Sequence, residues 1–344
     1  MIRLIIFFLS PFVLLSQDNI KYAETIIEAD LKKHLYILAS DSMEGRETGK
    51  PGQKKAAEYI ANHFKEIGIP PYKSNTYYQK FKIKNRKNHF CFLNCDDCDL
   101  DFIERLSRSN KWIKGENVLG YIEGTDLKEE LIIITVHYDH LGKHDTLIFN
   151  GADDNASGTA AALEIAQAFM LAKQNNKGPR RSILIMPVSG EEKGLLGSKY
   201  YTDYPVFPLD QTIANLNIDM IGRIDEFHDT ADYVYLIGSD KLSTDLHNIS
   251  EEINSEYIEL ELDYTFNSDD DPNRYYYRSD HYNFAKKNIP VIFYFNGVHE
   301  DYHQVTDTAE KIDFKKTESI ARLVFLTAWE LANRDERIRV DKAK

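Results

Sequence analysis

Histidine and acidic side chains collect directly after several apolar runs of this sequence that are typical of β-strands. LIIITV, SILIMPV, ANLNI and PVIFYF are each followed by such side chains, and so is a glycine-containing loop that opens an alanine-rich stretch. The segments concerned are HYDH at 137–140, GADDNASG at 151–158, SGEE at 189–192, Asp219, and HEDYH at 299–303. In open α/β sheets, ligands bind just beyond the carboxyl ends of strands, so these side chains are candidates for one shared site.

A metal ion explains this collection better than structural roles do. Carboxylates crowded at one end of a sheet repel one another and raise each other's pKa values unless a cation compensates. Each residue alone has a simpler interpretation, since Asp153 or Asp154 could cap the following helix and Asp219 could end a strand at a turn. The joint pattern favours a metal site. Mixed histidine and carboxylate ligands favour zinc, with other divalent ions as substitutes.

The same segments resemble the successive motifs of peptidase family M28, the co-catalytic zinc aminopeptidases. The motifs are HYDHLG, GADDNASGTAA, SGEEKGLLGS, LNIDMIGR and DYHQVTDT, in the order of that family over roughly residues 117–315, and the earlier GRETGKPG is similar too. The resemblance implies a cofactor of two Zn²⁺ ions. Its implied ligands are His137 and Asp219 for one ion, Glu192 and His303 for the other, and Asp154 as the bridge between them.

The resemblance also implies catalytic roles. Glu191 would stay off the metals as the general base, and the Asp139 carboxylate would orient the His137 imidazole. A water bridging the two ions would attack the peptide bond, and Glu191 would pass its proton to the leaving amine. If one zinc also receives the free amino group of the substrate, the enzyme is an aminopeptidase. Tyr276 aligns with a tyrosine that stabilises the oxyanion in some relatives, and packing is an equally good interpretation of it.

Rival functions fit parts of the pattern. HEDYH matches the HExxH motif of single-zinc proteases, but that motif requires a helix, whereas a preceding strand and Asn296-Gly297 predict a loop here. Glutaminyl cyclases, which are single-zinc acyltransferases, generally lack the first histidine that His137 supplies. An inactive binding module is disfavoured because all five ligands and Glu191 are retained. A carboxypeptidase or dipeptidase stays open, because the ligands do not determine which end of the substrate is bound. The neighbouring His140, Asp280 and His281 receive no role.

The elements that must position these residues can be predicted from apolar patterning. Several apolar runs lack polar alternation, as strands covered on both faces do. The predicted strands are 117–123, 131–136, 182–188, 213–218, 234–237 and 290–295, and the predicted helices between and after them are 156–172, 241–255 and 316–333. Residues 25–68 predict two more helices around a turn. The fold predicted is a three-layer α/β/α sandwich with a central mixed, mostly parallel sheet, which the resemblance describes as zinc exopeptidase-like.

Neither internal repeats nor low-complexity linkers divide the chain, so residues 17–344 are predicted to form a single zinc peptidase domain. Within it, about 72–114 is expected to be irregular. This segment carries the three cysteines, for which we expect a local disulfide or free thiols. A structural zinc knuckle is the alternative, with one histidine nearby to complete it. The residues concerned are Cys91, Cys95, Cys98 and His89.

The N-terminus predicts export. Arg3 precedes an apolar run that stops at Ser16, which is typical of a signal peptide over residues 1–16 and predicts a periplasmic or secreted protein. No later segment is long and apolar enough to predict a membrane span. The 55 acidic residues outnumber the 42 basic ones, and the net charge of −13 argues against a nucleic acid partner. The expected partners are peptides with a free N-terminus.

Overall fold

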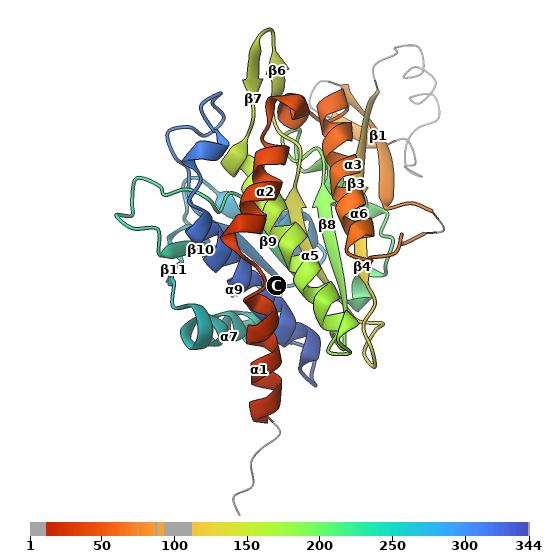
Figure 1. Ribbon diagram of the computed structural model, residues 1–344, viewed down its shortest axis with the longest axis vertical. Helices are drawn as coiled ribbons and strands as arrows, with labels where there is room; N and C mark the ends of the chain where they lie inside the picture. Colours follow the sequence, from red (N-terminus) through yellow and green to blue (C-terminus); the bar gives the residue numbers. More distant parts are fainter. Residues whose placement is uncertain (1–11, 74, 87–88, 93–111, 343–344) are drawn as a thin grey trace, which may run out of the picture.

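A seven-stranded sheet forms the centre of the computed structural model, which describes residues 12–73, 75–86, 89–92 and 112–342 (Figure 1). Its strand order is β11 (Glu261–Asp263), β10 (Tyr233–Ile237), β12 (Val291–Phe295), β9 (Thr212–Ile218), β5 (Leu131–His137), β8 (Ser182–Val188) and β4 (Gly120–Ile122). The four central strands β12, β9, β5 and β8 are parallel. The β4–β8 and β10–β12 pairs are antiparallel. The predicted mixed, mostly parallel sheet is therefore confirmed.

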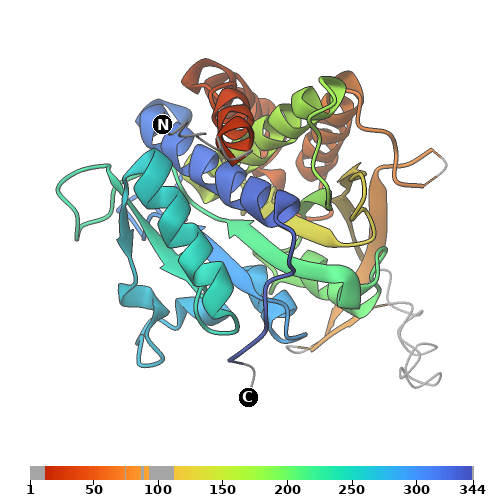
Figure 2. The same ribbon diagram turned by 90° about the horizontal axis from the view of Figure 1, so that it is seen from below.

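Helices cover both faces of this sheet. One face packs against α2 (Glu28–Leu38), α3 (Pro51–Glu66), α5 (Gly158–Gln174), α7 (Thr244–Ile253) and α9 (Phe314–Asn333). Figure 2 shows α2, α3 and α5 (red, orange and yellow-green) gathered on that side. The other face packs against α6 (Leu196–Asp203) and α8 (His281–Ala285). This arrangement is the predicted three-layer sandwich.

The central strands read as unbroken apolar runs because each buries side chains on both faces. All seven residues of β5 are buried. Ile132 and Ile134 pack into the core under α5 and α9, whereas Leu131 and Ile133 pack into the core under α6 and α8. Polar alternation would place half of these side chains in an apolar layer without hydrogen-bond partners.

Two helices begin at residues whose side chains cap the first turn. The Asp313 carboxylate accepts a hydrogen bond from the Lys316 backbone amide at the start of α9, and Ser243 caps α7 by accepting from the Leu246 amide. Each cap satisfies an amide that has no partner within the helix, which stabilises the helix by about 1 kcal/mol. α5 has no side-chain cap, and its small side chains let it pack closely against both α2 and α9.

Part of the segment expected to be irregular, about 72–114, forms strands. β1 (Tyr78–Arg86), β2 (His89–Phe92) and β3 (Ile113–Val118) form a small antiparallel sheet. In β1, Phe81 and Ile83 are buried while Lys82 is exposed, and this two-residue period is visible in the sequence. The predictions for the cysteines fall outside the described part, because Cys95 and Cys98 lie in 93–111 and the Cys91 side chain is not described.

At the N-terminus, α1 (Phe12–Ala23) runs through the predicted end of the signal peptide. Its described buried side chains begin at Asn19, and Tyr22 stacks on Trp329 with ring centroids 5.8 Å apart. The described packing contacts of α1 all lie after the predicted cleavage point, and removal of the signal peptide stays a prediction. Among the described helices, none combines the length and apolar character needed to cross a membrane.

Candidate active site

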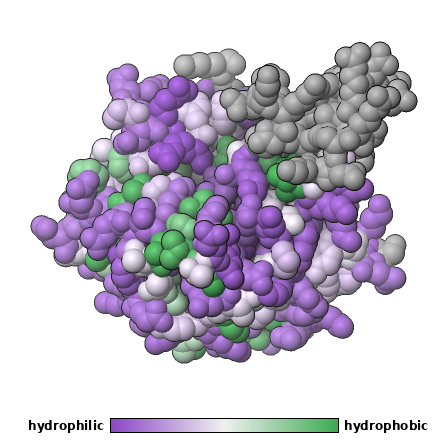
Figure 3. All heavy atoms as spheres, turned by 90° about the horizontal axis from the view of Figure 1, so that it is seen from above, coloured by the Kyte–Doolittle hydropathy of each residue, from purple (hydrophilic) through white to green (hydrophobic). Residues whose placement is uncertain are grey.

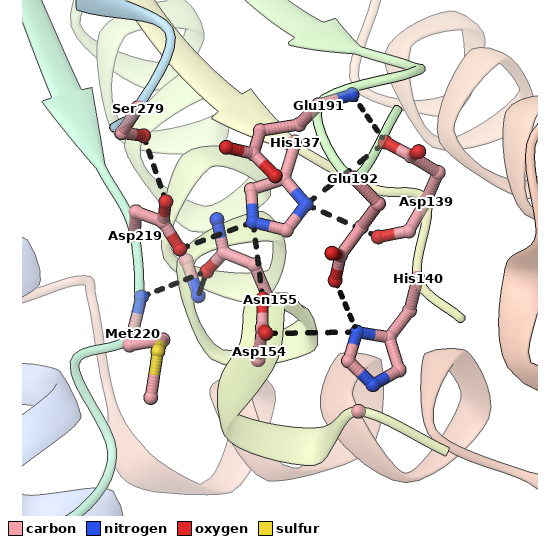
Figure 4. A network of polar contacts seen from close by, with 12 residues as sticks. His137, Asp139, His140, Asp154, Asn155, Glu191, Glu192, Asp219, Met220 and Ser279 are labelled. Carbon is pink, nitrogen blue, oxygen red and sulfur yellow. Dashed lines mark hydrogen bonds and ion pairs between the residues drawn. The ribbon is translucent and has the colours of Figure 1, made fainter. Parts of the chain in front are cut away.

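The site is built where parallel strands of the central sheet end together. His137 is the last residue of β5, Asp219 directly follows β9, and Glu191 and Glu192 lie in the turn after β8. His303 lies in the loop that follows β12. Because these four strands are parallel, their carboxyl ends share one edge of the sheet. Figure 4 shows the side chains of His137, Glu191, Glu192 and Asp219 converging there. Seen from above, this end of the molecule is largely hydrophilic, with some hydrophobic side chains near its middle (Figure 3).

A first group of metal-binding atoms surrounds the His137 imidazole. Its Nε2 lies 3.0 Å from Asp219 Oδ1 and 3.2 Å from Asp154 Oδ1. Asp154 reaches this position from the short turn Ala152–Ser157 that leads into α5, and its peptide bond to Asn155 is cis. All three side chains are buried or nearly so.

A second group lies on the other side of the Asp154 carboxylate. His303 Nε2 is 3.1 Å from Asp154 Oδ2 and 3.4 Å from Glu192 Oε2. Asp154 thus presents one oxygen to each group, as a carboxylate that bridges two cations does. The five residues predicted as ligands are brought together in the predicted pairing.

The spacing and chemistry of these atoms fit zinc. Ligands about 2.0–2.1 Å from a tetrahedral zinc lie roughly 3.3 Å from one another, close to the spacings within both groups. Burial lowers the pKa of His303, but hydrogen bonds to Asp154 and Glu192 outweigh this and raise it to about 10. This strongly negative environment favours a cation. Apart from its contact with the imidazole of His140, the buried Glu192 Oε1 has no hydrogen-bond partner among the described residues, as expected of an atom placed for a metal.

The sequence assigned no role to His140, and the structure places it in the second group. Its Nδ1 lies 2.8 Å from Glu192 Oε1 and 3.7 Å from Asp154 Oδ2. The residue is 1% exposed, and apart from these carboxylate contacts its ring nitrogens have no hydrogen-bond partner within the described chain. His140, Asp154 and Glu192 are near enough to one another to hold an ion together. The signal was present in HYDH, where this second histidine directly follows Asp139.

The Asp139 carboxylate does not orient the His137 imidazole as predicted, because the backbone oxygen of Asp139 takes that position. His137 Nδ1 is 3.1 Å from the Asp139 backbone oxygen, whereas the nearer carboxylate oxygen is 3.9 Å away, beyond hydrogen-bonding distance. The Asp139 carboxylate instead accepts hydrogen bonds from the Thr48 hydroxyl and from the Glu191 backbone amide, the latter at 3.3 Å. The backbone therefore orients the imidazole, and the carboxylate ties the Glu191 turn to the strand end of β5.

The family model described as Peptidase family M28 matches residues 117–328, which is more than half of the chain. The chain belongs to peptidase family M28. The matched region contains both groups of metal-binding atoms and Glu191.

One curated relative and two solved structures illustrate what this M28 chain is similar to. A probable zinc metalloprotease of Leptosphaeria maculans is 33% identical over 114 residues, which are 32% of this chain and 25% of the relative. The match therefore spans about a quarter of that protein's length. An aminopeptidase from Aneurinibacillus sp. strain AM-1 has a similar fold, with a TM-score of 0.66 and 16% identity over 95% of this chain and 98% of that one. Porphyromonas gingivalis glutaminyl cyclase is similarly close in fold, with a TM-score of 0.64 and 16% identity over 88% and 97% of the two chains.

Residues outside the two metal groups form hydrogen bonds that hold the carboxylates of this M28 site in position. Asp219 Oδ2 accepts a hydrogen bond of 2.7 Å from the Ser279 hydroxyl, which itself accepts from the Asn217 amide (Figure 4). The Asp307 carboxylate accepts the backbone amides of Asp153 and Asp154, and so fixes the turn that carries the bridging residue. These contacts reduce the freedom of the ligands before any ion binds.

The neighbouring residues Asp153 and Asp154 have different roles, since Asp153 makes structural contacts and Asp154 faces the metal groups. The Asp153 carboxylate accepts from the Gly222 amide at 2.6 Å and lies 3.1 Å from His299 Nε2, so it joins two loops. Only Asp154 faces both groups. His299 thus contributes to structure, and the HEDYH segment lies in turns rather than in a helix, as the loop prediction required.

Arg46, from the GRETGKPG segment, ties the loops of the site together. This fully buried side chain donates to the backbone carbonyls of Tyr138 and Gly151, at 2.8 and 2.9 Å, and to those of Leu38 and Asn150. It thereby links the residues after β5 to the turn that carries Asp154. Burial lowers the pKa of Arg46 to about 10, against nearby carboxylates that raise it, so the guanidinium stays charged at neutral pH.

Glu191 lies beside the metal-binding atoms without belonging to either group found among the described residues. Burial raises the pKa of its carboxyl well above the ordinary value. The nearby His137 opposes this rise, and the charge of Glu192 adds to it. Bound cations would lower the pKa again and favour the carboxylate form that a base needs.

A cavity opens from Glu191 and the first group toward solvent. It is walled by both metal groups, by aromatic and aliphatic side chains, and by one guanidinium. Its lining residues outside the groups are Met220, Tyr275, Arg278, Phe293, Phe295, Val298 and Tyr302.

Tyr275 lines this cavity, whereas Tyr276 lines a separate one. The Tyr276 ring lies 5.7 Å from the His281 ring and 5.4 Å from Lys241 Nζ. These are the packing contacts that were the alternative interpretation of this tyrosine. Its role as an oxyanion donor stays a prediction.

Proposed function

We propose that this M28 peptidase is an aminopeptidase that binds two zinc ions and uses Glu191 as its general base. The observation that carries the proposal is the Asp154 carboxylate, with Oδ1 3.2 Å from His137 Nε2 and Oδ2 3.1 Å from His303 Nε2. One bridging carboxylate between two histidine-containing groups suits a pair of ions.

Zinc at such a site supplies Lewis acidity and makes water more acidic. The residues of the chain supply the rest. Glu191 takes the proton of the attacking water and returns it to the leaving amine. The hydrogen bond from its backbone amide to Asp139 keeps the turn of Glu191 in place relative to His137.

The complete first group supports a peptidase over a glutaminyl cyclase. A cyclase with a single zinc ion requires only the ligand atoms around Glu192. The 3.0 Å distance between His137 Nε2 and Asp219 Oδ1 in the first group would have no function in such an enzyme. The aminopeptidase label draws support from the structural neighbour of that name, which shares the fold.

One panel of peptides tests the substrate end. The panel has a single sequence in four forms: free at both ends, acetylated at the N-terminus, amidated at the C-terminus, and carrying an N-terminal glutamine. An aminopeptidase cleaves the free and amidated forms and fails on the acetylated form. Cleavage that ignores acetylation contradicts the proposal, and cyclisation of the glutamine peptide without hydrolysis identifies a glutaminyl cyclase.

A pair of variants tests the general base. Glu191→Gln should retain both ions and lose at least about a hundredfold in kcat, because one proton-transfer group contributes roughly 10²–10⁴-fold. Glu300→Gln is the matched control, since Glu300 is the exposed glutamate of the HExxH match. Near-normal kcat in Glu191→Gln, or a comparable loss in Glu300→Gln, would count against the assignment.

Metal analysis tests the ion count. Purified protein should contain about two zinc ions per chain, and His137→Ala should reduce this toward one. A single ion that persists with full activity after this substitution contradicts the two-metal proposal.

We also propose that the chain is exported with removal of residues 1–16. The support is the sequence pattern of Arg3 followed by an apolar run. N-terminal sequencing of protein from fractionated cells tests this, and an intact N-terminus on cytoplasmic protein contradicts it.

A further inference from the structure

We propose that Arg278 is a specificity-determining residue that binds a carboxylate of the peptide substrate. The inference rests on the proposed peptidase function and goes further by naming a chemical class of substrate. Arg278 lines the cavity that also contains Glu191 and His137, and among the described residues that line this cavity it is the only lysine or arginine. A peptide positioned for attack at the metal groups therefore lies within the same space as its guanidinium.

The Arg278 guanidinium is held in place without being neutralised. Its Cζ lies 4.8 Å from the centroid of the Tyr275 ring, and Tyr275 also lines the cavity. Stacking on an aromatic ring restricts a long side chain while leaving the edges of the guanidinium able to donate hydrogen bonds. Arg278 also hydrogen-bonds to the Tyr275 side chain and is exposed, and within the described chain no carboxylate forms an ion pair with it.

This lack of an acidic partner is informative in a protein with a net charge of −13. Of the carboxylates that line the same cavity, Asp154 and Asp219 contact His137 in the first metal group, and Glu191 is the proposed general base. They are thus committed to the metals or to the reaction, and an arginine in the same cavity would be left to recognise another anion. A planar guanidinium matches a carboxylate through two parallel hydrogen bonds.

The remaining walls suit the same ligand. Met220, Phe293, Phe295 and Val298 provide apolar surface around the cavity. An acidic side chain consists of methylenes that end in a carboxylate, so apolar walls with one guanidinium match it. The other source of a carboxylate is the free C-terminus of a dipeptide, whose length would place this group near the reacting bond.

Arg274 provides a matched control. It is also exposed, and its Cζ also lies over a tyrosine ring, 4.7 Å from the centroid of Tyr277. It lines the separate cavity of Tyr276 and not the cavity of Glu191. Loss of a surface charge or of an arginine–tyrosine stack should therefore affect both arginine variants, whereas substrate recognition should depend on Arg278 alone.

The experiment compares kcat/KM for two substrate pairs with the zinc-loaded full chain. The first pair, Glu-Ala-Ala amide and Gln-Ala-Ala amide, isolates the side-chain carboxylate. The second, Leu-Ala and Leu-Ala amide, isolates the C-terminal carboxylate. The wild type should prefer the carboxylate member of one pair by roughly tenfold to a hundredfold, because hydrogen bonds between charged groups have this effect on affinity. The preference should disappear in Arg278→Gln, fall partly in Arg278→Lys, and persist in Arg274→Gln.

The outcomes separate this inference from the proposed function. A preference in the first pair identifies an acidic N-terminal residue, and one in the second identifies the C-terminus of a dipeptide. Cleavage by the wild type without preference in either pair overturns the role of Arg278 and leaves the peptidase proposal standing. A preference that survives in Arg278→Gln also overturns it. Failure to cleave any of the four peptides contradicts both.

Discussion

Replacing His140 should weaken the binding of one zinc ion and leave the other largely unaffected. Its Nδ1 lies 2.8 Å from Glu192 Oε1 in the second group, whereas the first group around His137 includes no atom of His140. His140→Phe keeps a planar ring but has no nitrogen, so it removes the polar contact with little loss of volume.

The magnitude follows from the contact that is lost. A hydrogen bond to a charged group contributes about 1.5–3 kcal/mol, and 1.4 kcal/mol corresponds to a tenfold change in affinity. The weaker site should therefore lose roughly ten- to a hundredfold in zinc affinity, the range also seen when residues that support metal ligands are replaced. His303→Ala removes a predicted direct ligand of the same ion and should have the larger effect.

Competition with a chromophoric zinc chelator measures the two affinities, and elemental analysis gives the number of ions retained. The visible spectrum of the cobalt-substituted protein reports the coordination of each site independently of activity. His144→Ala is the control, because this histidine is exposed in the hairpin of β6 (Gly142–His144) and β7 (Leu147–Phe149). The reasoning would be refuted if His140→Phe left the zinc affinity of each site as it is in the wild type. It would also be refuted if both sites lost zinc affinity by the same factor.

Two further predictions concern stability. Arg46→Met should lower the free energy of unfolding by at least about 3 kcal/mol in urea titrations, because it leaves buried carbonyls without donors, and an unchanged midpoint would contradict the role of Arg46. Burial lowers the pKa of His63 to about 4, with His34 adding to this. Between pH of about 4 and about 6.5 the unfolded chain then binds the extra proton, so acid destabilises the fold by up to about 3 kcal/mol in this window. His63→Leu should remove that part of the pH dependence in urea titrations of metal-free protein, whereas identical pH profiles would exclude His63 as its source.

The part of the fold that positions the metals could be predicted from the sequence because it follows from strand order and direction. Fully apolar runs predicted strands covered on both faces, and parallel strands deliver the residues after them to one edge. The strand pattern made His137 and Asp219 candidates, since each lies at or next to the last residue of its strand, and the resemblance assigned them as ligands. The bridging role of Asp154 over Asp153 came from the resemblance, and contacts formed by distant loops explain the division.

The remaining features depend on side-chain direction and on contacts far apart in the chain. Asp139 follows a metal ligand closely, yet its carboxylate turns toward Thr48 and Glu191, which no local pattern predicts. Residues 275–277 are all tyrosines, so the sequence could not show which of them lines the cavity of Glu191. In the structure it is Tyr275. For β1, the alternation of lysine with apolar residues was a usable signal that the surrounding polar segment obscured.

His303 is the most exposed side chain of the two metal groups, and its exposure bears on where a substrate enters. The side chains of His137 and Asp219 are 1% and 11% exposed, whereas that of His303 is 34% exposed. His303 therefore forms the more exposed side of the cavity that the first group also lines. Arg278 and Tyr302 line the same cavity as Glu191, so a substrate that reaches the proposed base lies beside residues that no metal motif specifies. The strand ends thus supply the candidate metal ligands, whereas loop residues such as Arg278 and Tyr302 are placed to select the peptide.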